Sequence, residues 1–357
     1  MHGWIILDKP LGLGSTQGVS AVKRALRTGG YGKFKVGHGG TLDPLATGVL
    51  PIAIGEATKL AGRMLDSDKV YDFTIRFGEQ TDTLDGEGVA IATSDVRPTA
   101  AALEAVLPQF TGEIEQVPPA YSALKVDGER AYDLARAGEE VVLATRPVTI
   151  HSLNTSPERG GGPAKLVEGL VGREQASHAT SRVRREDVDD AGPGSAQPAP
   201  PPFAEEANGP PPRTGEVLEG GEVLQEATLT AHVSKGTYIR SLARDIALAL
   251  GTVGHVTMLR RTKAGPFTLE NAISLDKLHE AAMARDLEHL LLPLRAGLDD
   301  IPALPLTPDQ AGLLRQGRVL SGIASDDGLC FATLDDVPVA LAEVQDGNVS
   351  VIRGFNL

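Results

Sequence analysis

A proline-rich stretch in the middle of the chain restricts its fold more than any other feature. Residues 191–212 hold 8 of the 24 prolines. Proline fixes φ and lacks a backbone N–H, so this stretch cannot supply a sheet ladder or a helix interior. The preceding run of mixed charge, RVRREDVDD at residues 182–190, is typical of a solvated segment. We therefore predict that residues 156–222 are a disordered Pro/Gly-rich insert between two parts of one folded domain.

Regular patterns of apolar residues return on both sides of the insert. Apolar and polar side chains alternate over residues 70–77 and again over residues 229–233, which predicts two half-buried strands. Helices are predicted at residues 17–27 with Ser15 or Thr16 as N-cap, at 100–107, at 130–137, and at 238–250 with Thr237 as N-cap. Strands and helices alternate without a strict βαβ repeat. The predicted fold class is therefore α+β, with a mixed or antiparallel central sheet flanked by helices.

The C-terminal part of the chain has a different pattern. After residue 293 it changes to short apolar pieces separated by Pro, Asp and Gly, which indicates a small β domain. A length of 357 residues accommodates about two domains of ordinary size. We expect a main domain formed by residues 1–155 and 223–292, and a small C-terminal β domain at residues 293–357.

The charge of the chain is unevenly distributed. A net charge of −13 argues against a protein that coats nucleic acid or anionic lipid through bulk charge. Yet residues 1–60 carry seven Lys/Arg and three acids, and residues 231–265 carry six Lys/Arg and one acid. Residues 301–357, by contrast, carry three Lys/Arg and seven acids. We expect the two basic regions to meet in the fold and to form one phosphate-binding face.

Several classes of protein are disfavoured by composition. The single cysteine, Cys330, excludes an intramolecular disulfide and any multi-cysteine zinc or iron–sulfur site. No window approaches ~18 consecutive apolar residues, and the N-terminal residues lack a signal-peptide pattern. We expect a soluble cytoplasmic protein with no membrane association.

A glycine-rich segment contains the most concentrated set of candidate functional residues. It reads KVGHGGTLDPLATGVL at residues 35–50, which predicts an irregular loop that approaches another group closely. Asp43 and Pro44 could form an ordinary turn, but glycine-rich and apolar flanks favour a functional carboxylate. His38 could be a ligand, a base or a packed polar residue. No second His or Cys stands nearby at metal-ligand spacing, so we expect no metal.

A second candidate segment, SKGTYIRSLARDI at residues 234–246, joins a strand to a helix. Arg240 lies in the first turn of the predicted helix, where backbone N–H groups and a guanidinium together suit an anion. Tyr238 offers either a stacking surface or a core ring. Taken alone, the same segment could also be a solvated helix with a stripe of Lys and Arg and no binding role.

Three familiar motifs do not match this sequence. The glycines at residues 12, 14 and 18 follow a short apolar run, but a dinucleotide fingerprint needs the third glycine one position earlier. The expected acidic residue about 20 positions further on is also missing, which disfavours a dinucleotide-dependent oxidoreductase. Neither a Gly-x-Ser-x-Gly elbow nor a P-loop occurs, so serine hydrolases and P-loop NTPases have no support.

Six short motifs occur in a fixed order along the chain. They are LDKP at 7–10, GHGGTLDPLATG at 37–48, GEATK at 55–59, TDTLD at 81–85, PAYSALK at 119–125 and SKGTYIR at 234–240. Together they resemble the bacterial tRNA pseudouridine-55 synthases, the B-type branch of the pseudouridine synthases. The resemblance covers about residues 3–155 and 223–270.

The resemblance implies an isomerase that converts one uridine in the T-loop of tRNA to pseudouridine without a cofactor. It assigns Asp43 as the nucleophile, which would attack either ribose C1′ or base C6. It assigns Arg240 as the partner that keeps Asp43 ionised and aimed, and Tyr71 to base stacking and proton transfer. A carboxylate nucleophile is chemically consistent with this reaction, because covalent catalysis separates glycosidic cleavage from re-attachment through C5.

The resemblance also implies four substrate-binding residues. His38 would contact the region of the flipped nucleotide, Lys9 would lie near the pocket rim, and Tyr238 and Leu259 would form the pocket wall. The C-terminal domain would be of the RNA-binding PUA type. The partner would be the T-arm of tRNA, bound by a monomer with no protein partner. A catalytically silent tRNA-binding or RNA-folding module on the same scaffold is the alternative, which the presence of Asp43, Tyr71 and Arg240 disfavours.

Overall fold

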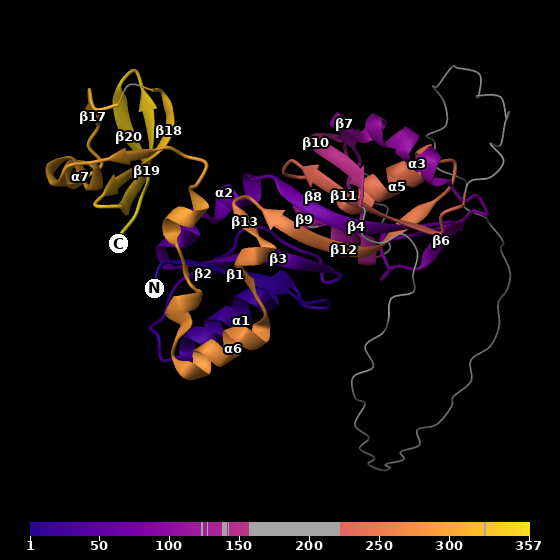
Figure 1. Ribbon diagram of the computed structural model, residues 1–357, viewed down its shortest axis with the longest axis horizontal. Helices are drawn as coiled ribbons and strands as arrows, with labels where there is room; N and C mark the ends of the chain where they lie inside the picture. The colour runs from indigo at the N-terminus through magenta and orange to yellow at the C-terminus, as the bar shows by residue number, and fades with distance from the viewer. Residues whose placement is uncertain (123, 127, 138–140, 142, 157–221, 325) are drawn as a thin grey trace, which may run out of the picture. The chain divides into compact units, whose positions relative to one another are not determined.

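The computed structural model describes residues 1–122, 124–126, 128–137, 141, 143–156, 222–324 and 326–357 (Figure 1). The predicted disordered insert, residues 156–222, lies outside the described residues except at its two ends. Among the residues that are described, no helix is both long and apolar enough to cross a membrane.

An eleven-stranded mixed sheet forms the centre of the main unit. Adjacent strands in this sheet are antiparallel, except for the pairs β1/β14 and β3/β12, which are parallel. The strand order is β14 (Ala272–Ile273), β1 (Gly3–Lys9), β3 (Ala46–Ile54), β12 (Gly254–Ala264), β4 (Lys69–Phe77), β11 (Glu226–Val233), β10 (Arg146–Thr155) and β7 (Gly112–Gln116). Three short strands join this path at β3, β12 and β1: β2 (Val36–His38), β13 (Phe267–Thr268) and β15 (Leu292–Pro293). The predicted α+β class is confirmed.

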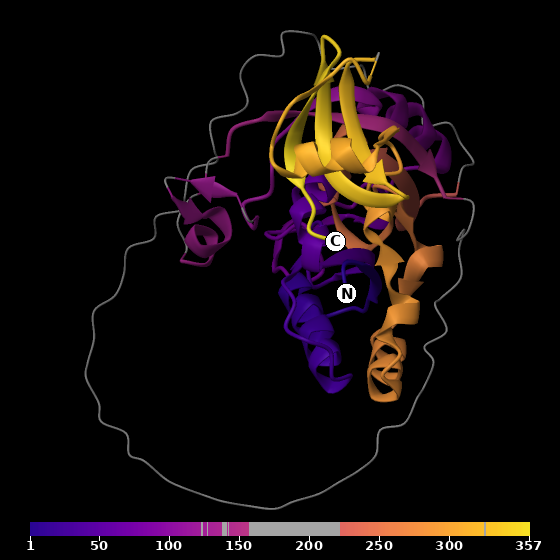
Figure 2. The same cartoon turned by 90° about the vertical axis from the view of Figure 1, so that its left-hand side faces the viewer.

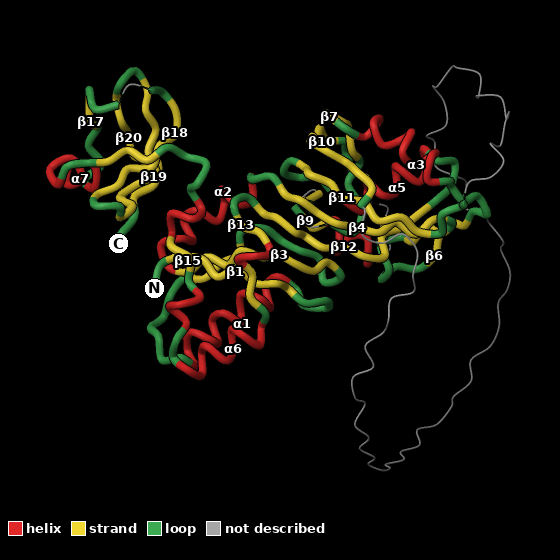
Figure 3. The backbone as a smooth tube through the Cα atoms, in the orientation of Figure 1, coloured by secondary structure: helices red, strands yellow, loops and turns green. Residues whose placement is uncertain are grey.

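The two strands predicted from alternation form the middle of this sheet. In β4, Phe73 and Ile75 are fully buried, and in β11 Leu229 and Ala231 are fully buried. They pack against α3 (Ala100–Val106) and α5 (Ile239–Ala249), which lie beside these strands in Figure 3. Each fully buried side chain of this size adds about 1.5–3 kcal/mol, so the alternating pattern specifies which face of the sheet is covered.

A second group of helices covers β1 and β3. α1 (Ser15–Thr28) and α6 (Leu275–Ala284) lie side by side and pack on Ile5 and Leu7 of β1 (Figure 1). Tyr71 of β4 and Leu259 of β12 contact both this cluster and the one under α5. These two residues therefore mark the middle of the sheet, between the two helical groups.

The opposite face of β1 and β3 has its own core. Trp4 and Ile6 pack there against η1 (Gly55–Leu60), α2 (Ala61–Asp66) and η5 (Leu294–Gly297). Shorter elements complete the main unit: β5 (Glu79–Thr81), β6 (Ala90–Thr93), β8 (Lys125–Val126), β9 (Glu129–Arg130) and α4 (Ala131–Arg136).

Two helix starts differ from the sequence-based prediction. α1 has Gly14 at its N-cap, not Ser15 or Thr16, because the Ser15 hydroxyl bonds to the backbone of Leu42 instead. α5 begins after Tyr238, and the Thr237 hydroxyl donates to the carbonyl of Ser234 rather than capping the helix. In both cases a partner outside the helix takes the hydroxyl. At α3, by contrast, the Thr99 side chain accepts from the backbone N–H of Ala102 and caps the helix.

A separate five-stranded sheet forms the C-terminal β domain (yellow in Figures 1 and 2). It begins at Ala303, later than the boundary expected at residue 293, since β15 pairs with β1 and Leu294 packs on the main sheet. Its strand order is β16 (Ala303–Pro305), β18 (Gly328–Leu334), β19 (Val337–Gln345), β20 (Asn348–Gly354) and β17 (Leu320–Ser321), with α7 (Pro308–Arg315) packed on it.

Candidate active site

The loop between β2 and β3 carries Asp43, and the buried Lys9 side chain bonds to its backbone. The Lys9 ammonium donates to the carbonyls of Leu13 at 2.6 Å, Pro10 at 3.1 Å and Pro44 at 3.2 Å. The backbone N–H of Gly12 donates to the same Pro44 carbonyl at 2.9 Å. The segment after β1 and the Asp43 loop are thereby fastened to each other.

Arg261 fixes the other side of the same loop. Its side chain is 1% exposed, and its guanidinium donates to the carbonyls of Val49 at 2.8 Å, Thr41 at 3.3 Å and Gly40 at 3.3 Å. Gly48 has a φ of +99°, and a Cβ there would lie 2.2 Å from the Arg261 carbonyl oxygen. Only glycine fits at this position. It lets β12 approach β3 closely, so the Arg261 side chain reaches the backbone of the loop.

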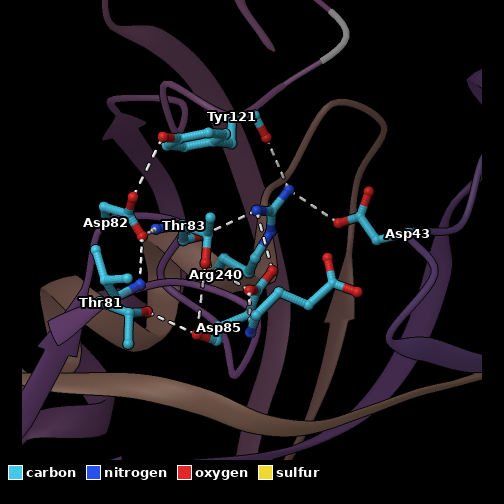
Figure 4. Close-up of polar contacts among 9 residues, drawn as sticks. Asp43, Thr81, Asp82, Thr83, Asp85, Tyr121 and Arg240 are labelled. Carbon is cyan, nitrogen blue, oxygen red and sulfur yellow. Dashed lines mark hydrogen bonds and ion pairs between the residues drawn. The ribbon is translucent and has the colours of Figure 1, made fainter. Parts of the chain in front are cut away.

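Arg240, at the start of α5, pairs with Asp43 at 2.9 Å and with Asp85 at 3.2 Å (Figure 4). It also donates to the carbonyls of Thr83 at 2.8 Å and Tyr121 at 3.0 Å. The Arg240 side chain is 8% exposed, whereas the Asp43 side chain is 45% exposed. Asp43 is therefore held on one side by a fixed guanidinium and open on the other, as a nucleophile must be.

Asp85 is itself held in place. Its carboxylate accepts from the Thr83 hydroxyl at 2.6 Å and from the backbone N–H of Glu87 at 3.1 Å. A buried carboxylate is tolerated only when it is paired and hydrogen-bonded, because desolvation of an unpaired charge is expensive. Asp85 thus orients Arg240, which in turn orients Asp43.

A pocket of about 320 Å³ opens beside Asp43. Its basic side chains are Lys69, Arg240 and Arg261, and Asp43 is the only acid among its described lining residues. The pocket therefore has a positive potential that favours an anionic ligand. Its remaining lining residues are Gly40, Thr41, Leu42, Ala46, Leu65, Tyr71, Ser122, Val233, Ser234, Gly236, Thr237, Tyr238, Ile239 and Leu259.

Burial lowers the pKa of two lysines at the site. Desolvation lowers the pKa of Lys9 to about 8, and the Asp43 carboxylate partly offsets this effect. Desolvation also lowers the pKa of Lys69 to about 8, with a smaller contribution from the positive charge of Arg261. Lys69 donates to the carbonyls of Leu65 and Ser67, so its ammonium is held at the pocket wall.

The structure brings five of the predicted site residues together in this pocket: Asp43, Tyr71, Tyr238, Arg240 and Leu259. Two others lie elsewhere. Lys9, expected at the pocket rim, is completely buried under the Asp43 loop, because three backbone carbonyls converge on its ammonium. His38 lies on β2 and does not line the pocket, and burial lowers its pKa, so it is neutral at pH 7.

Three residues of the site were missed by sequence reasoning: Asp85, Lys69 and Arg261. Asp85 is the last residue of the TDTLD motif. The motif therefore indicated that this segment matters, but not that Asp85 pairs with Arg240. Lys69 and Arg261 are single basic residues in strands, and only the excess of basic charge over residues 231–265 pointed to Arg261. Their positions depend on strand pairing, which a local sequence pattern does not reveal.

Two family models and the fold place this chain among the pseudouridine synthases. A chain of an H/ACA RNP bound to a substrate RNA containing 2'-deoxyuridine superimposes with a TM-score of 0.61 at 20% identity, covering 99% of this chain and 85% of that chain. Residues 23–159 match the TruB family pseudouridylate synthase N-terminal domain, and residues 240–299 match the tRNA pseudouridylate synthase B C-terminal domain.

Curated relatives match over the full length. The tRNA pseudouridine synthase B of Novosphingobium aromaticivorans is 58% identical, and that of Zymomonas mobilis is 51% identical. Each match covers 100% of this chain, with 98% and 96% of the relative. This chain belongs to the TruB family of pseudouridylate synthases. It is an isomerase, as the six motifs indicated.

Proposed function

We propose that this chain converts uridine 55 in the T-loop of tRNA to pseudouridine, with Asp43 as the nucleophile. The observation that carries the proposal is the half-exposed Asp43 carboxylate, held at 2.9 Å by the buried Arg240 guanidinium at the edge of a basic pocket. The full-length match to proteins named tRNA pseudouridine synthase B supports tRNA as the substrate.

Arg240 holds the nucleophile in place. A two-point contact with Asp43 and Asp85 prevents the guanidinium from rotating away. The contact leaves the exposed side of Asp43 free for the uridine. Asp43 forms a covalent bond to the nucleotide, at C1′ or at C6, and the bond between N1 and C1′ breaks. The base then turns and C5 bonds to C1′. The bond to Asp43 breaks and its electron pair returns to the carboxylate, C5 loses its proton, and N1 gains one.

The pocket wall holds the uracil between these steps. Tyr71 and Leu259 lie between the two helical clusters, and both line the pocket with Tyr238. The Tyr71 ring stacks on the flipped base and takes part in proton transfer. Unstacking a base costs roughly a few kcal/mol, which ring contacts and exclusion of water in the pocket offset.

Positive charge around the pocket assists binding of the RNA backbone. Lys69, Arg240 and Arg261 surround one acid, although the whole chain has a net charge of −13. A local basic site on an acidic protein concentrates affinity at one place and limits non-specific binding. Recognition then depends on the shape and phosphates of the T-loop. We also propose that the enzyme acts as a monomer in the cytoplasm and uses no cofactor.

Incubation of the protein with unmodified tRNA, followed by mapping of pseudouridine, tests this function. The expected result is one pseudouridine, at position 55, and none in a transcript with cytidine at that position. Pseudouridine at another position only would contradict the assignment of the substrate site. No pseudouridine in any uridine-containing tRNA would contradict the proposed function.

A further inference from the structure

Three side chains with metal-binding groups converge outside the Asp43 pocket. Nε2 of His151 lies 3.2 Å from Oδ2 of Asp68, and Nε2 of His232 lies 3.7 Å from the same oxygen. All three ligand atoms are within 4.8 Å of one another. The two imidazole rings are 4.7 Å apart between centroids and inclined by 47°. The site described above uses none of these residues.

Neighbouring strands of one sheet position the three side chains. His151 is on β10, His232 on β11 and Asp68 immediately precedes β4; β11 pairs with both β10 and β4. In β11, Ala231 and Val233 point into the core, so His232 points to the opposite face. The ligands therefore come from rigid, hydrogen-bonded elements, which favours a defined site.

The pairing of β10 with β11 places His151 on the same face of the sheet as His232. The register shifts between Ile150, which pairs with Val233, and Ser152, which pairs with His232. Ile150 and Val233 are buried, so their chain neighbours His151 and His232 point to the opposite face of the sheet.

The separations fit a tetrahedral ion. Zinc binds imidazole nitrogen and carboxylate oxygen at about 2.0–2.2 Å, which places two ligand atoms of a tetrahedron about 3.3 Å apart. The distances of 3.2 and 3.7 Å from Asp68 to the two imidazoles bracket this value. The third separation, between the ligand atoms of the two imidazoles, is within 4.8 Å.

The surroundings of the three side chains affect the binding of a cation. The positive charge of Lys263 nearby opposes a cation, and Asp68 counteracts it. Asp68 and His151 are exposed, which leaves room for a water as the fourth ligand.

We propose that Asp68, His151 and His232 bind one divalent transition metal ion of the zinc type. The site fastens β4, β11 and β10 together on the face opposite α5. The sequence-based expectation of no metal considered only residues close to His38 along the chain. These three ligands are far apart in sequence and meet only through strand pairing.

Titration of the chelator-treated full-length protein with Zn²⁺ alone, in competition with a chromophoric chelator, tests the site. We expect one high-affinity equivalent, weakened at least about 100-fold by His151→Ala or His232→Ala. His289→Ala is the matched control, because His289 is also an exposed histidine paired with an aspartate, Asp286. It should leave the affinity unchanged. Equal affinity in the wild type and both site variants would overturn the proposal.

Two further measurements use the same proteins. Co²⁺ should give the absorption bands of a tetrahedral complex in the wild type but not in Asp68→Asn. Zn²⁺ should raise the melting temperature of the wild type and not of His232→Ala, since a ligand that binds only the folded state stabilises it. Mg²⁺ should have no such effect, because it prefers six oxygen ligands. Equal stabilisation by Mg²⁺ and Zn²⁺ would contradict a histidine-based site.

Discussion

At the scale of single residues, Arg240 determines the geometry of the site. Its guanidinium contacts Asp43, Asp85 and two backbone carbonyls, so each of its two terminal nitrogens has two acceptors. A lysine at this position would provide one ammonium in place of a planar fork with five N–H donors. The charge would be kept, but the orientation of Asp43 would not.

Arg240→Lys should therefore lower the single-turnover rate on tRNA by about 100-fold or more, with little change in tRNA affinity. The lysine keeps a positive charge beside Asp85, so the fold should survive. Arg244→Lys is the control on the same helix, because Arg244 pairs with the neighbouring Asp245. A wild-type rate for Arg240→Lys would show that the fork geometry has no role.

Lys9 gives a prediction about pH. Its pKa is about 8 in the folded protein and 10.5 in an unfolded chain, so between these pH values the unfolded chain binds more protons. The free energy of unfolding should therefore rise with pH over this window, relative to Lys9→Met, by at most roughly 3 kcal/mol. Urea unfolding of both proteins from pH 7 to 10.5 measures this difference. A difference that falls with pH would contradict the buried lysine.

At the scale of elements, the first turn of α1 positions the Asp43 loop. The buried Ser15 hydroxyl donates to the Leu42 carbonyl at 2.9 Å and accepts from the Leu42 N–H at 2.8 Å. Both backbone groups of the residue before Asp43 thus depend on one side chain. A serine at a helix start predicts an N-cap, and this prediction was wrong because a partner distant in sequence binds the hydroxyl more completely.

Ser15→Ala should lower the free energy of unfolding by about 1–3 kcal/mol, because two buried backbone groups lose their partner. The single-turnover rate should fall by about 10-fold or more, since Leu42 directly precedes Asp43. Ser20→Ala is the control on the exposed side of α1 and should change stability by less than about 0.5 kcal/mol. Equal effects of the two substitutions would remove Ser15 from the positioning of the loop.

At the scale of the whole molecule, the helices and strands could be predicted better than the tertiary contacts between them. Alternation identified β4 and β11 with their buried faces, because burial on one face is a local property of a strand. The resemblance brought Asp43 and Arg240 together in advance. Neither approach placed Lys9 correctly, because its burial depends on three carbonyls from two segments. The pairing of Asp85 with Arg240 and the cluster around His232 likewise arise only in the folded sheet.

The predicted insert, residues 156–222, also gives a prediction at this scale. β10 and β11 are antiparallel neighbours, with Thr155 opposite Leu229, and Val223 bridges to Thr99. The residues that flank the predicted insert are thus attached to the main unit. Replacing residues 156–222 by a short Gly/Ser bridge should leave the melting temperature within a few degrees and the rate on tRNA within about 3-fold. An insoluble or inactive product would show that the insert has a structural or catalytic role.

The central claim is that Asp43 performs covalent catalysis on a uridine of tRNA. Formation of pseudouridine releases the hydrogen from C5, so release of tritium from tRNA labelled at C5 of uridine reports turnover directly. For Asp43→Asn, which keeps the shape of the side chain, the account predicts no detectable release, and tRNA affinity within about 3-fold of the wild type. Release of tritium at the wild-type rate by Asp43→Asn would contradict it.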